Sequence, residues 1–170
     1  MKRIILSAIA FMAIGFAHAQ NGHFKVGAHA GAVVGDLQKS YSANLGIDAA
    51  YLWSITDKFS LGATTGFTAY VPKSYNYNSA PYPGYVNRNP EASFVPVAGT
   101  AQYSITDNLF LGADLGFAIF TGKKGTSDGG ILYQPKFGYQ TNKIELFAAY
   151  KGITNDGNIA SLNIGFNYKF

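Results

Sequence analysis

The last twelve residues of the chain, Ile159 to Phe170, alternate almost without exception between apolar and polar side chains. The apolar set comprises Ala160, Leu162, Ile164, Phe166, Tyr168 and Phe170. The polar set comprises Ser161, Asn163, Gly165, Asn167 and Lys169. Because successive side chains of a strand point to opposite faces, this pattern predicts a β-strand with one apolar face, which becomes aromatic toward Phe170. The segment therefore restricts the chain to folds whose sheet has one apolar and one polar face.

A repeat organises the middle of the chain. Residues 53–67, WSITDKFSLGATTGF, return fifty positions later as residues 103–117, YSITDNLFLGADLGF, with nine of fifteen positions identical. In both copies, Ser-Ile-Thr-Asp lies between two alternating runs, and its polar side chains can bond the backbone of a tight turn. The repeat predicts two hairpins of one design.

Extending the alternation from these turns predicts eight strands. They cover residues 23–34, 41–53, 59–70, 94–103, 109–120, 131–140, 144–150 and 159–170. Short turns at 54–58, 104–108 and 141–143 alternate with longer connections at 35–40, 71–93, 121–130 and 152–158. Each strand is close to the length that crosses a membrane when tilted, and an open sheet edge is not tolerated in lipid. We therefore predict an all-β, eight-stranded antiparallel up-and-down transmembrane barrel.

The two faces of each strand indicate which side chains meet lipid. The fifth strand directs Leu109, Leu111, Ala113, Leu115, Phe117 and Ile119 outward, and the same reasoning places Tyr41, Leu45, Ile47, Ala49, Tyr51 and Trp53 outward on the second. Aromatic residues near strand ends could form the girdles of a membrane barrel. Pro96 and Pro135 lie within predicted strands and are expected to mark bulges or strand limits.

The amino terminus predicts export. Lys2 and Arg3 precede the apolar run 4–16 and an Ala-His-Ala cleavage site, so residues 1–19 are predicted to be a signal peptide and 20–170 the barrel domain. The chain has no Cys, which argues against a lipoprotein and a disulfide scaffold. Without Lys2 and Arg3 the net charge falls from +4 to +2, and the remaining cations are scattered, so no nucleic-acid partner is expected.

The size, the eight alternating segments and the closing residues Asn163-Ile164-Gly165-Phe166-Asn167-Tyr168-Lys169-Phe170 resemble the small outer-membrane β-barrel domain family of OmpA/OmpX-type proteins from Gram-negative envelopes. The resemblance implies that the barrel-assembly machinery reads the last strand. That role would fall to Ile164, Phe166, Tyr168 and Phe170. The chain ends at the barrel, so the peptidoglycan-binding role of longer members is not implied. We expect contact with outer-membrane lipid and lipopolysaccharide.

Several charged residues lie at positions that the alternation directs into the barrel interior. The predicted interior network comprises Lys25, His29, Asp48, Asp114, Lys136, Glu145 and Lys151. An eight-stranded barrel has room for side chains and little else, and enclosed acids and bases should pair. We therefore predict an interior closed by side chains. The alternative is that these charges lie near the barrel mouths in water.

The sequence gives little support for catalysis or for a bound cofactor. Beyond the signal peptide only His23 and His29 could act as an imidazole base, and His29 beside Asp48 is more readily a structural contact. No clustered His or Cys has metal-ligand spacing. We predict no catalytic residue, no cofactor and no metal site.

The connection 71–93 is the most unusual one, because it is rich in tyrosine and proline. Its candidate recognition residues are Tyr75, Tyr77, Tyr82 and Tyr85. Tyrosine gives a large amphipathic contact area, so we expect this loop to bind an extracellular glycan or protein. The alternative is a loop that packs over the barrel mouth or against lipid headgroups. Two other functions stay open, which are a narrow channel for small solutes and a secreted soluble barrel that holds an apolar ligand inside.

Overall fold

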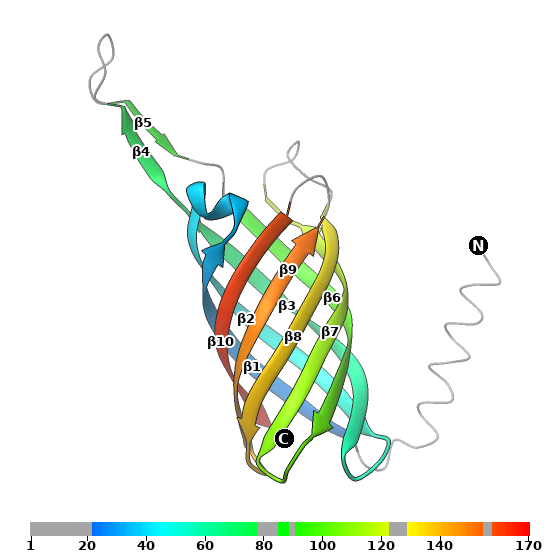
Figure 1. Cartoon of the computed structure of the whole chain (residues 1–170). Helices are drawn as coiled ribbons and strands as arrows, with labels where there is room; N and C mark the ends of the chain where they lie inside the picture. The colour runs from blue at the N-terminus through cyan, green and yellow to red at the C-terminus, as the bar shows by residue number, and fades with distance from the viewer. Residues whose placement is uncertain (1–21, 78–84, 89–90, 123–128, 155–157) are drawn as a thin grey trace, which may run out of the picture.

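The chain folds into a closed barrel of eight antiparallel strands (Figure 1). The computed structural model describes residues 22–77, 85–88, 91–122, 129–154 and 158–170. The barrel strands are β1 (Gly22–Val34), β2 (Tyr41–Ser54), β3 (Phe59–Pro72), β6 (Ala92–Ser104), β7 (Leu109–Phe120), β8 (Gly130–Gln140), β9 (Ile144–Thr154) and β10 (Asn158–Lys169). Their order around the barrel is β1-β10-β9-β8-β7-β6-β3-β2. The predicted eight-stranded up-and-down barrel is confirmed, with β9 continuing to Thr154 rather than ending at Tyr150.

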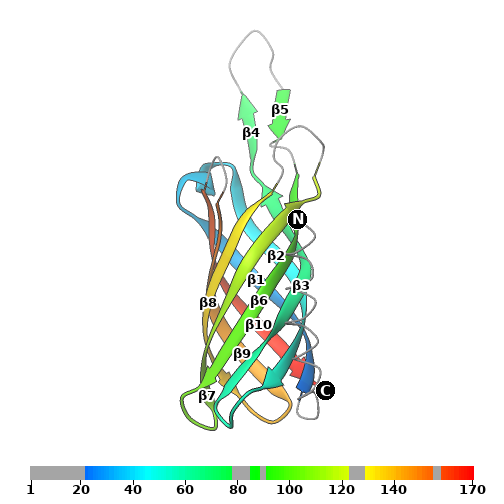
Figure 2. The same cartoon turned by 90° about the vertical axis from the view of Figure 1, so that its right-hand side faces the viewer.

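The two ends of the barrel differ. At one end lie the three short turns and the carboxyl terminus, which we call the short-turn end (Figures 1 and 2). At the other, the loop end, lie the 3-10 helix η2 (Asp36–Lys39) and a hairpin of β4 (Ser74–Tyr77) and β5 (Tyr85–Arg88). This hairpin projects beyond the barrel wall, so part of the predicted 71–93 loop is a two-stranded ribbon (Figure 2).

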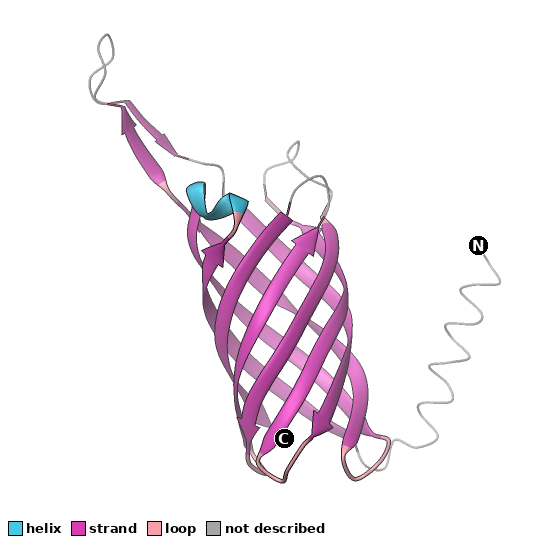
Figure 3. Cartoon of the chain, viewed as in Figure 1, coloured by secondary structure: helices cyan, strands magenta, loops and turns pink. Residues whose placement is uncertain are grey.

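Helical structure is minor in this fold. Within the described ranges, η2 is the one helical segment, and it lies above the ends of β1 and β2 (Figure 3). No helix in the described part of the chain is long and apolar enough to cross a membrane.

The sequence repeat forms two equivalent hairpins, as predicted. In the β2-β3 turn, the Ile55 amide donates to the Phe59 carbonyl at 2.9 Å, and in the β6-β7 turn, the Ile105 amide donates to the Leu109 carbonyl at 2.8 Å. The hydroxyl oxygen of Thr56 accepts the amide of Phe59 at 3.0 Å, and the equivalent Thr106 accepts the amide of Leu109, also at 3.0 Å. A threonine side chain therefore fixes each turn through its own backbone.

The barrel is apolar outside and polar or aromatic inside. Along β7, Leu115 is 67% exposed on the outer face, whereas its neighbour on the inner face, Asp114, is 5% exposed. The same alternation follows the other strands, with Ile47 and Ile164 among the most exposed apolar residues. A soluble barrel with its apolar face inward would show the reverse pattern, so the structure does not support that alternative.

Tyr41 departs from the predicted face. It was placed outward by simple alternation along β2, but it is buried inside the barrel and packs edge-to-face on Tyr70. The pairing of β2 with β3 shifts register between Tyr41 and Ala43, where the ladder skips one residue. Such an irregularity reverses the alternation locally, because two residues on one strand then oppose one on the other.

The prediction for the two prolines is wrong. Both β6 and β8 continue through Pro96 and Pro135, so neither proline ends its strand. The ladder between β3 and β6 is interrupted opposite Pro96, and the ladder between β8 and β9 is interrupted opposite Pro135. Beyond each interruption the strands pair again in the same register. No bulge is needed, because a proline removes only the hydrogen bond on the side its nitrogen faces.

Candidate functional site

The interior near the short-turn end contains a buried ion pair built from four strands. Lys25 of β1 donates to Glu145 of β9 at 2.6 Å and to the side-chain oxygen of Gln102 of β6, also at 2.6 Å. The second oxygen of Glu145 accepts the amide of Asn167 of β10 at 3.0 Å. Lys169 lies 3.9 Å from Glu145, nearer the mouth. Glu145 therefore has both oxygens bonded while it is 1% exposed.

A second ion pair lies on β7 and β8, the two strands between those that hold Glu145 and Gln102. Lys136 of β8 is 2.6 Å from Asp114 of β7, and its ammonium lies 5.5 Å from the ring centre of Phe147. Both side chains face inward because Lys136 pairs with Gly112, two residues before Asp114 on β7. The ammonium thus spans one strand separation to reach its carboxylate.

The middle of the barrel holds a histidine between an acid and a lysine. Nδ1 of His29 is 2.5 Å from Asp48, and its Nε2 is 3.0 Å from the Lys151 ammonium. Because an ammonium only donates, Nε2 accepts this hydrogen bond and the ring proton lies on Nδ1, toward Asp48. Lys151 also donates to Thr68 at 3.1 Å.

This group resembles a hydroxyl-imidazole-carboxylate triad only in composition. The Thr68 hydroxyl is 3.3 Å from His29 Nε2, but Thr68 is buried, and Lys151 already donates to both of its neighbours. A nucleophile must reach a substrate carbonyl, and this one lies inside the barrel beneath apolar side chains. The arrangement can hold charges in place, and the hydroxyl that would have to act as the nucleophile is itself buried. Among the described residues, no group of three or more His, Cys, Asp or Glu could hold a metal ion.

An apolar cluster fills the interior at the loop end, and sequence reasoning missed it. The loop-end cluster comprises Val33, Tyr41, Tyr70, Ala92, Phe94, Ala98, Ala118, Leu132 and Ile153. Tyr70 packs edge-to-face on Phe94 at 5.8 Å between ring centres, and Phe94 packs likewise on Phe120 at 5.3 Å. The signal was present in the sequence, because Tyr70, Phe94 and Phe120 occupy inward positions where strands end. The prediction weighed only the charged members of the inward set.

The structure brings the predicted interior residues together in two layers. The lower layer, toward the short-turn end, holds Lys25, Glu145, Asp114 and Lys136, and the middle layer holds His29, Asp48 and Lys151. Their side chains lie inside the barrel rather than in open water at its mouths.

The predicted loop and signal residues are only partly described. Tyr75, Tyr77 and Tyr85 lie in β4 and β5, and Tyr82 lies outside the described residues, as does the predicted signal peptide 1–19.

The four residues assigned to barrel assembly share the outer face of β10 and its end. Ile164 is 72% exposed and Phe170 is 74% exposed, with Phe166 and Tyr168 between them on the same face. The amide of Phe170 donates to the Phe24 carbonyl at 2.9 Å, which joins the end of the chain to β1. The closing strand pair therefore presents an aromatic outer edge at the short-turn end.

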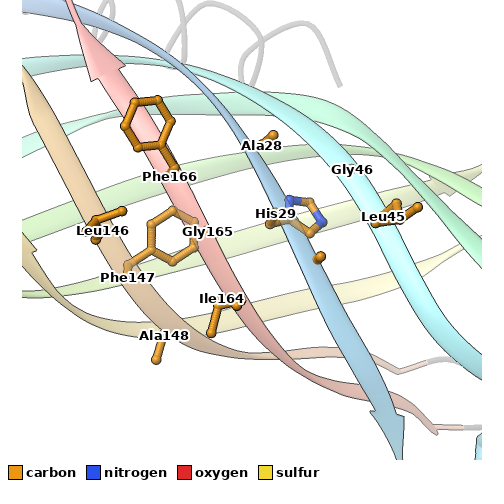
Figure 4. A pocket seen from close by; sticks show the side chains of 11 residues that line it. Ala28, His29, Leu45, Gly46, Leu146, Phe147, Ala148, Ile164, Gly165 and Phe166 are labelled. Atoms are coloured by element: carbon orange, nitrogen blue, oxygen red, sulfur yellow. The ribbon is translucent and has the colours of Figure 1, made fainter.

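A shallow groove of about 690 Å³ runs along the outer wall over β1, β2, β9 and β10 (Figure 4). Its lining includes Ala28 of β1, Leu45 of β2, and Ile164 and Phe166 of β10 (Figure 4). Ala30 of β1 also lines it. The groove results from small side chains between large ones on an apolar surface. The groove is concave, but it has few polar groups that could orient a ligand.

No protein family model and no curated protein sequence matches the chain. Solved structures with a similar fold do exist. Ail, the attachment invasion locus protein of Yersinia pestis, is 14% identical with a TM-score of 0.53, over 88% of this chain and 97% of Ail. The N-terminal β-barrel domain of Pseudomonas aeruginosa OprF is 11% identical with a TM-score of 0.52, over 88% and 98% of the two chains.

A designed transmembrane β-barrel is similar to the same degree. It is 15% identical with a TM-score of 0.52, over 90% of this chain and 99% of the design. At such low identities these likenesses concern the fold. The chain therefore has the fold of the small eight-stranded outer-membrane β-barrels.

Proposed function

We propose that the chain is an integral outer-membrane β-barrel protein with a structural or surface-interaction role, whose interior is closed by side chains. The observation that carries this proposal is a closed eight-stranded barrel with an apolar exterior and paired charges inside. A closed barrel satisfies its backbone hydrogen bonds without water, which a lipid environment requires. Outward Leu, Ile, Val and Phe side chains supply the band that meets lipid.

The proposed closure rests on two different fillings. The loop-end cluster packs aromatic rings across the barrel near one end, and the two charged layers lie below it together with a second apolar cluster of Phe110, Phe147 and Ala149. These fillings are what the narrow interior of an eight-stranded barrel accommodates, and they weigh against a steady solute channel. The same closure supports a protein without enzymatic activity, since the charged groups inside are paired with one another.

Membrane fractionation tests the proposal most directly. We expect the protein in the outer-membrane fraction, and we expect unboiled samples to migrate differently from boiled ones in detergent gels, because a closed barrel resists detergent until heated. Recovery as soluble protein without a heat-dependent shift would contradict membrane insertion.

A charge on the outer wall tests which face meets lipid. Leu115→Arg is expected to destabilise the folded barrel in lipid vesicles by about 2–4 kcal/mol, because an arginine near the middle of the bilayer leaves water for hydrocarbon. Urea unfolding measures the loss. Thr121→Arg, beyond the loop end of β7, provides the control and should cost less than about 1 kcal/mol. Equal losses at both sites would contradict a lipid-facing position for Leu115.

The surface-interaction role is assigned to the 71–93 connection. Its β4-β5 hairpin projects from the loop end, where the barrel would face the cell exterior (Figure 2). Candidate contacts are Tyr75, Tyr77, Tyr82 and Tyr85, and the proposed partner is an extracellular glycan or protein. The similar structure of Ail belongs to a protein that is named for attachment, which favours the same class of role.

A deletion tests this role. Replacing residues 75–85 with a short Gly-Ser linker is expected to abolish most binding of expressing cells to glycan-coated or matrix-protein-coated surfaces, because the tyrosines are removed while the barrel is kept. Replacing residues 122–128 with the same linker, which leaves β7 and β8 whole, is the control and should leave binding unchanged. Unchanged binding after the 75–85 replacement would favour the alternative, in which this loop only covers the mouth or contacts headgroups.

Export and assembly complete the proposal. The predicted signal peptide 1–19 would direct the chain across the inner membrane. The outward aromatic edge formed by Phe166, Tyr168 and Phe170 supports recognition by the barrel-assembly machinery. Outer-membrane lipid and lipopolysaccharide would surround the apolar exterior.

A further inference from the structure

A small cavity lies inside the lower layer of the barrel, between the two buried ion pairs. Its volume is about 20 Å³, and its polar lining comes from Lys25, Thr100, Gln102, Lys136, Glu145 and Asn167. A cavity of this size accepts roughly one water molecule or one ion of similar size. Any species bound in this cavity would therefore have to be a single atom or a molecule about the size of water.

Hydrogen-bond donors outnumber acceptors around this cavity. Each ammonium carries three N–H donors. Lys25 uses two of them, on Gln102 and Glu145, and Lys136 uses one, on Asp114. Among the described residues, no other acceptor lies within hydrogen-bond distance of either ammonium. Three N–H groups thus remain beside the cavity, which suits a species that only accepts.

Two of the side-chain acceptor groups that line the cavity, those of Glu145 and Gln102, are already engaged, which leaves the Thr100 hydroxyl and the Asn167 side-chain oxygen. Glu145 lines the cavity, but one of its oxygens accepts from Lys25 and Gln102, and the other accepts from Asn167. The Gln102 oxygen accepts from Lys25. A water molecule in the cavity would receive N–H donors, but for its own two protons it would find only the Thr100 hydroxyl and the Asn167 oxygen as unengaged side-chain acceptors of the lining.

The charge around the cavity points the same way. Three lysines, Lys25, Lys136 and Lys169, face two carboxylates, Asp114 and Glu145. A carboxylate shared by Lys25 and Lys169 leaves one positive charge without its own partner in a narrow interior, where uncompensated charge is costly. The side chains of Lys136 and Lys169 are 16% and 14% exposed, so solvent reaches this layer.

We propose that the cavity between Lys25 and Lys136 binds one small monovalent anion of the chloride class. The anion accepts from the free N–H groups of both ammonium ions and balances the excess positive charge of the lower layer. It enters from the short-turn end, where the layer is open to solvent. The stability of the barrel then depends on halide concentration, because the anion binds the folded state and not the unfolded chain.

Bromide locates the site. Crystals of the detergent-purified barrel grown in sodium bromide should show one anomalous-scattering peak between the Lys25 and Lys136 ammonium groups, and crystals grown in sodium gluconate should show none there. A cavity that contains only non-anomalous density in bromide would overturn the proposal in favour of a water molecule.

A solution measurement tests the same site without crystals. At constant ionic strength set with gluconate, raising chloride to ten times its dissociation constant should lower the unfolding equilibrium constant about tenfold. The double variant Asp114→Asn/Lys136→Met removes one ammonium from the cavity without changing net charge, and it should lose this dependence.

A second double variant serves as the matched control. Asp48→Asn/Lys151→Met also removes one acid and one lysine from the interior, but neither residue lines the cavity, so its chloride dependence should persist. Equal chloride dependence in the two double variants would overturn the assignment to this cavity. If a variant fails to fold, the bromide peak in the wild-type barrel decides alone.

Discussion

Replacing Glu145 with alanine is expected to lower the free energy of unfolding by about 3–5 kcal/mol, because it leaves a buried ammonium without its carboxylate. Lys25 would keep only the Gln102 oxygen, and Asn167 would lose the acceptor for its amide. Urea unfolding in lipid vesicles, followed by the fluorescence of Trp53, the single tryptophan, measures the change.

Two further variants separate charge pairing from other effects of this substitution. Glu91→Ala removes an exposed glutamate at the loop end and should change stability by less than about 0.5 kcal/mol. Lys25→Met/Glu145→Gln removes both charges and should recover most of the loss, since a buried pair can often be replaced by neutral groups. A loss that persists undiminished in the double variant would show that Glu145 does not act through its pair with Lys25.

The architecture was predictable because one physical rule governs every strand. Apolar residues alternate with small or polar ones, and this period of two determined the faces of Leu115 and Phe110 without knowledge of any neighbour. The repeated Ser-Ile-Thr-Asp turns fixed where two strand pairs reverse. The pairing of the polar side chains was less predictable than their inward direction. Alternation places Lys25 and Glu145 inside the barrel, but it does not determine that these two side chains meet.

The features that were missed depend on three-dimensional neighbours. The inward position of Tyr41 results from a register shift against β3, which leaves no mark in the local pattern of β2. Pro96 and Pro135 are tolerated because the ladder on one side of each strand stays intact, and sequence alone does not identify that side. The loop-end cluster assembles rings from β2, β3, β6 and β7, so it appears only once the barrel has closed.

Removing one ring from the loop-end cluster is expected to be as costly as breaking the ion pair. Phe94→Ala should lower the free energy of unfolding by about 3–5 kcal/mol, because it deletes a side chain that is 2% exposed and leaves a cavity between Tyr70 and Phe120. The surrounding strands are held in one closed ladder, so they can move inward only slightly to fill the gap. Urea unfolding in vesicles measures the loss.

Phe117→Ala is the matched control for Phe94→Ala, since it deletes the same atoms from the outer wall, where the ring is 44% exposed. Lipid chains can refill that space, so the loss should be clearly smaller because it lacks the cavity contribution. Equal losses would show that Phe94 is not part of a rigid interior filling.

In planar bilayers, neither the wild-type barrel nor Phe94→Ala should carry a steady current, because the middle layer with Lys151 and the lower layer with Lys25 remain below the deleted ring. A large, steady conductance from the wild-type protein would contradict the closed interior and restore the narrow channel as the better description.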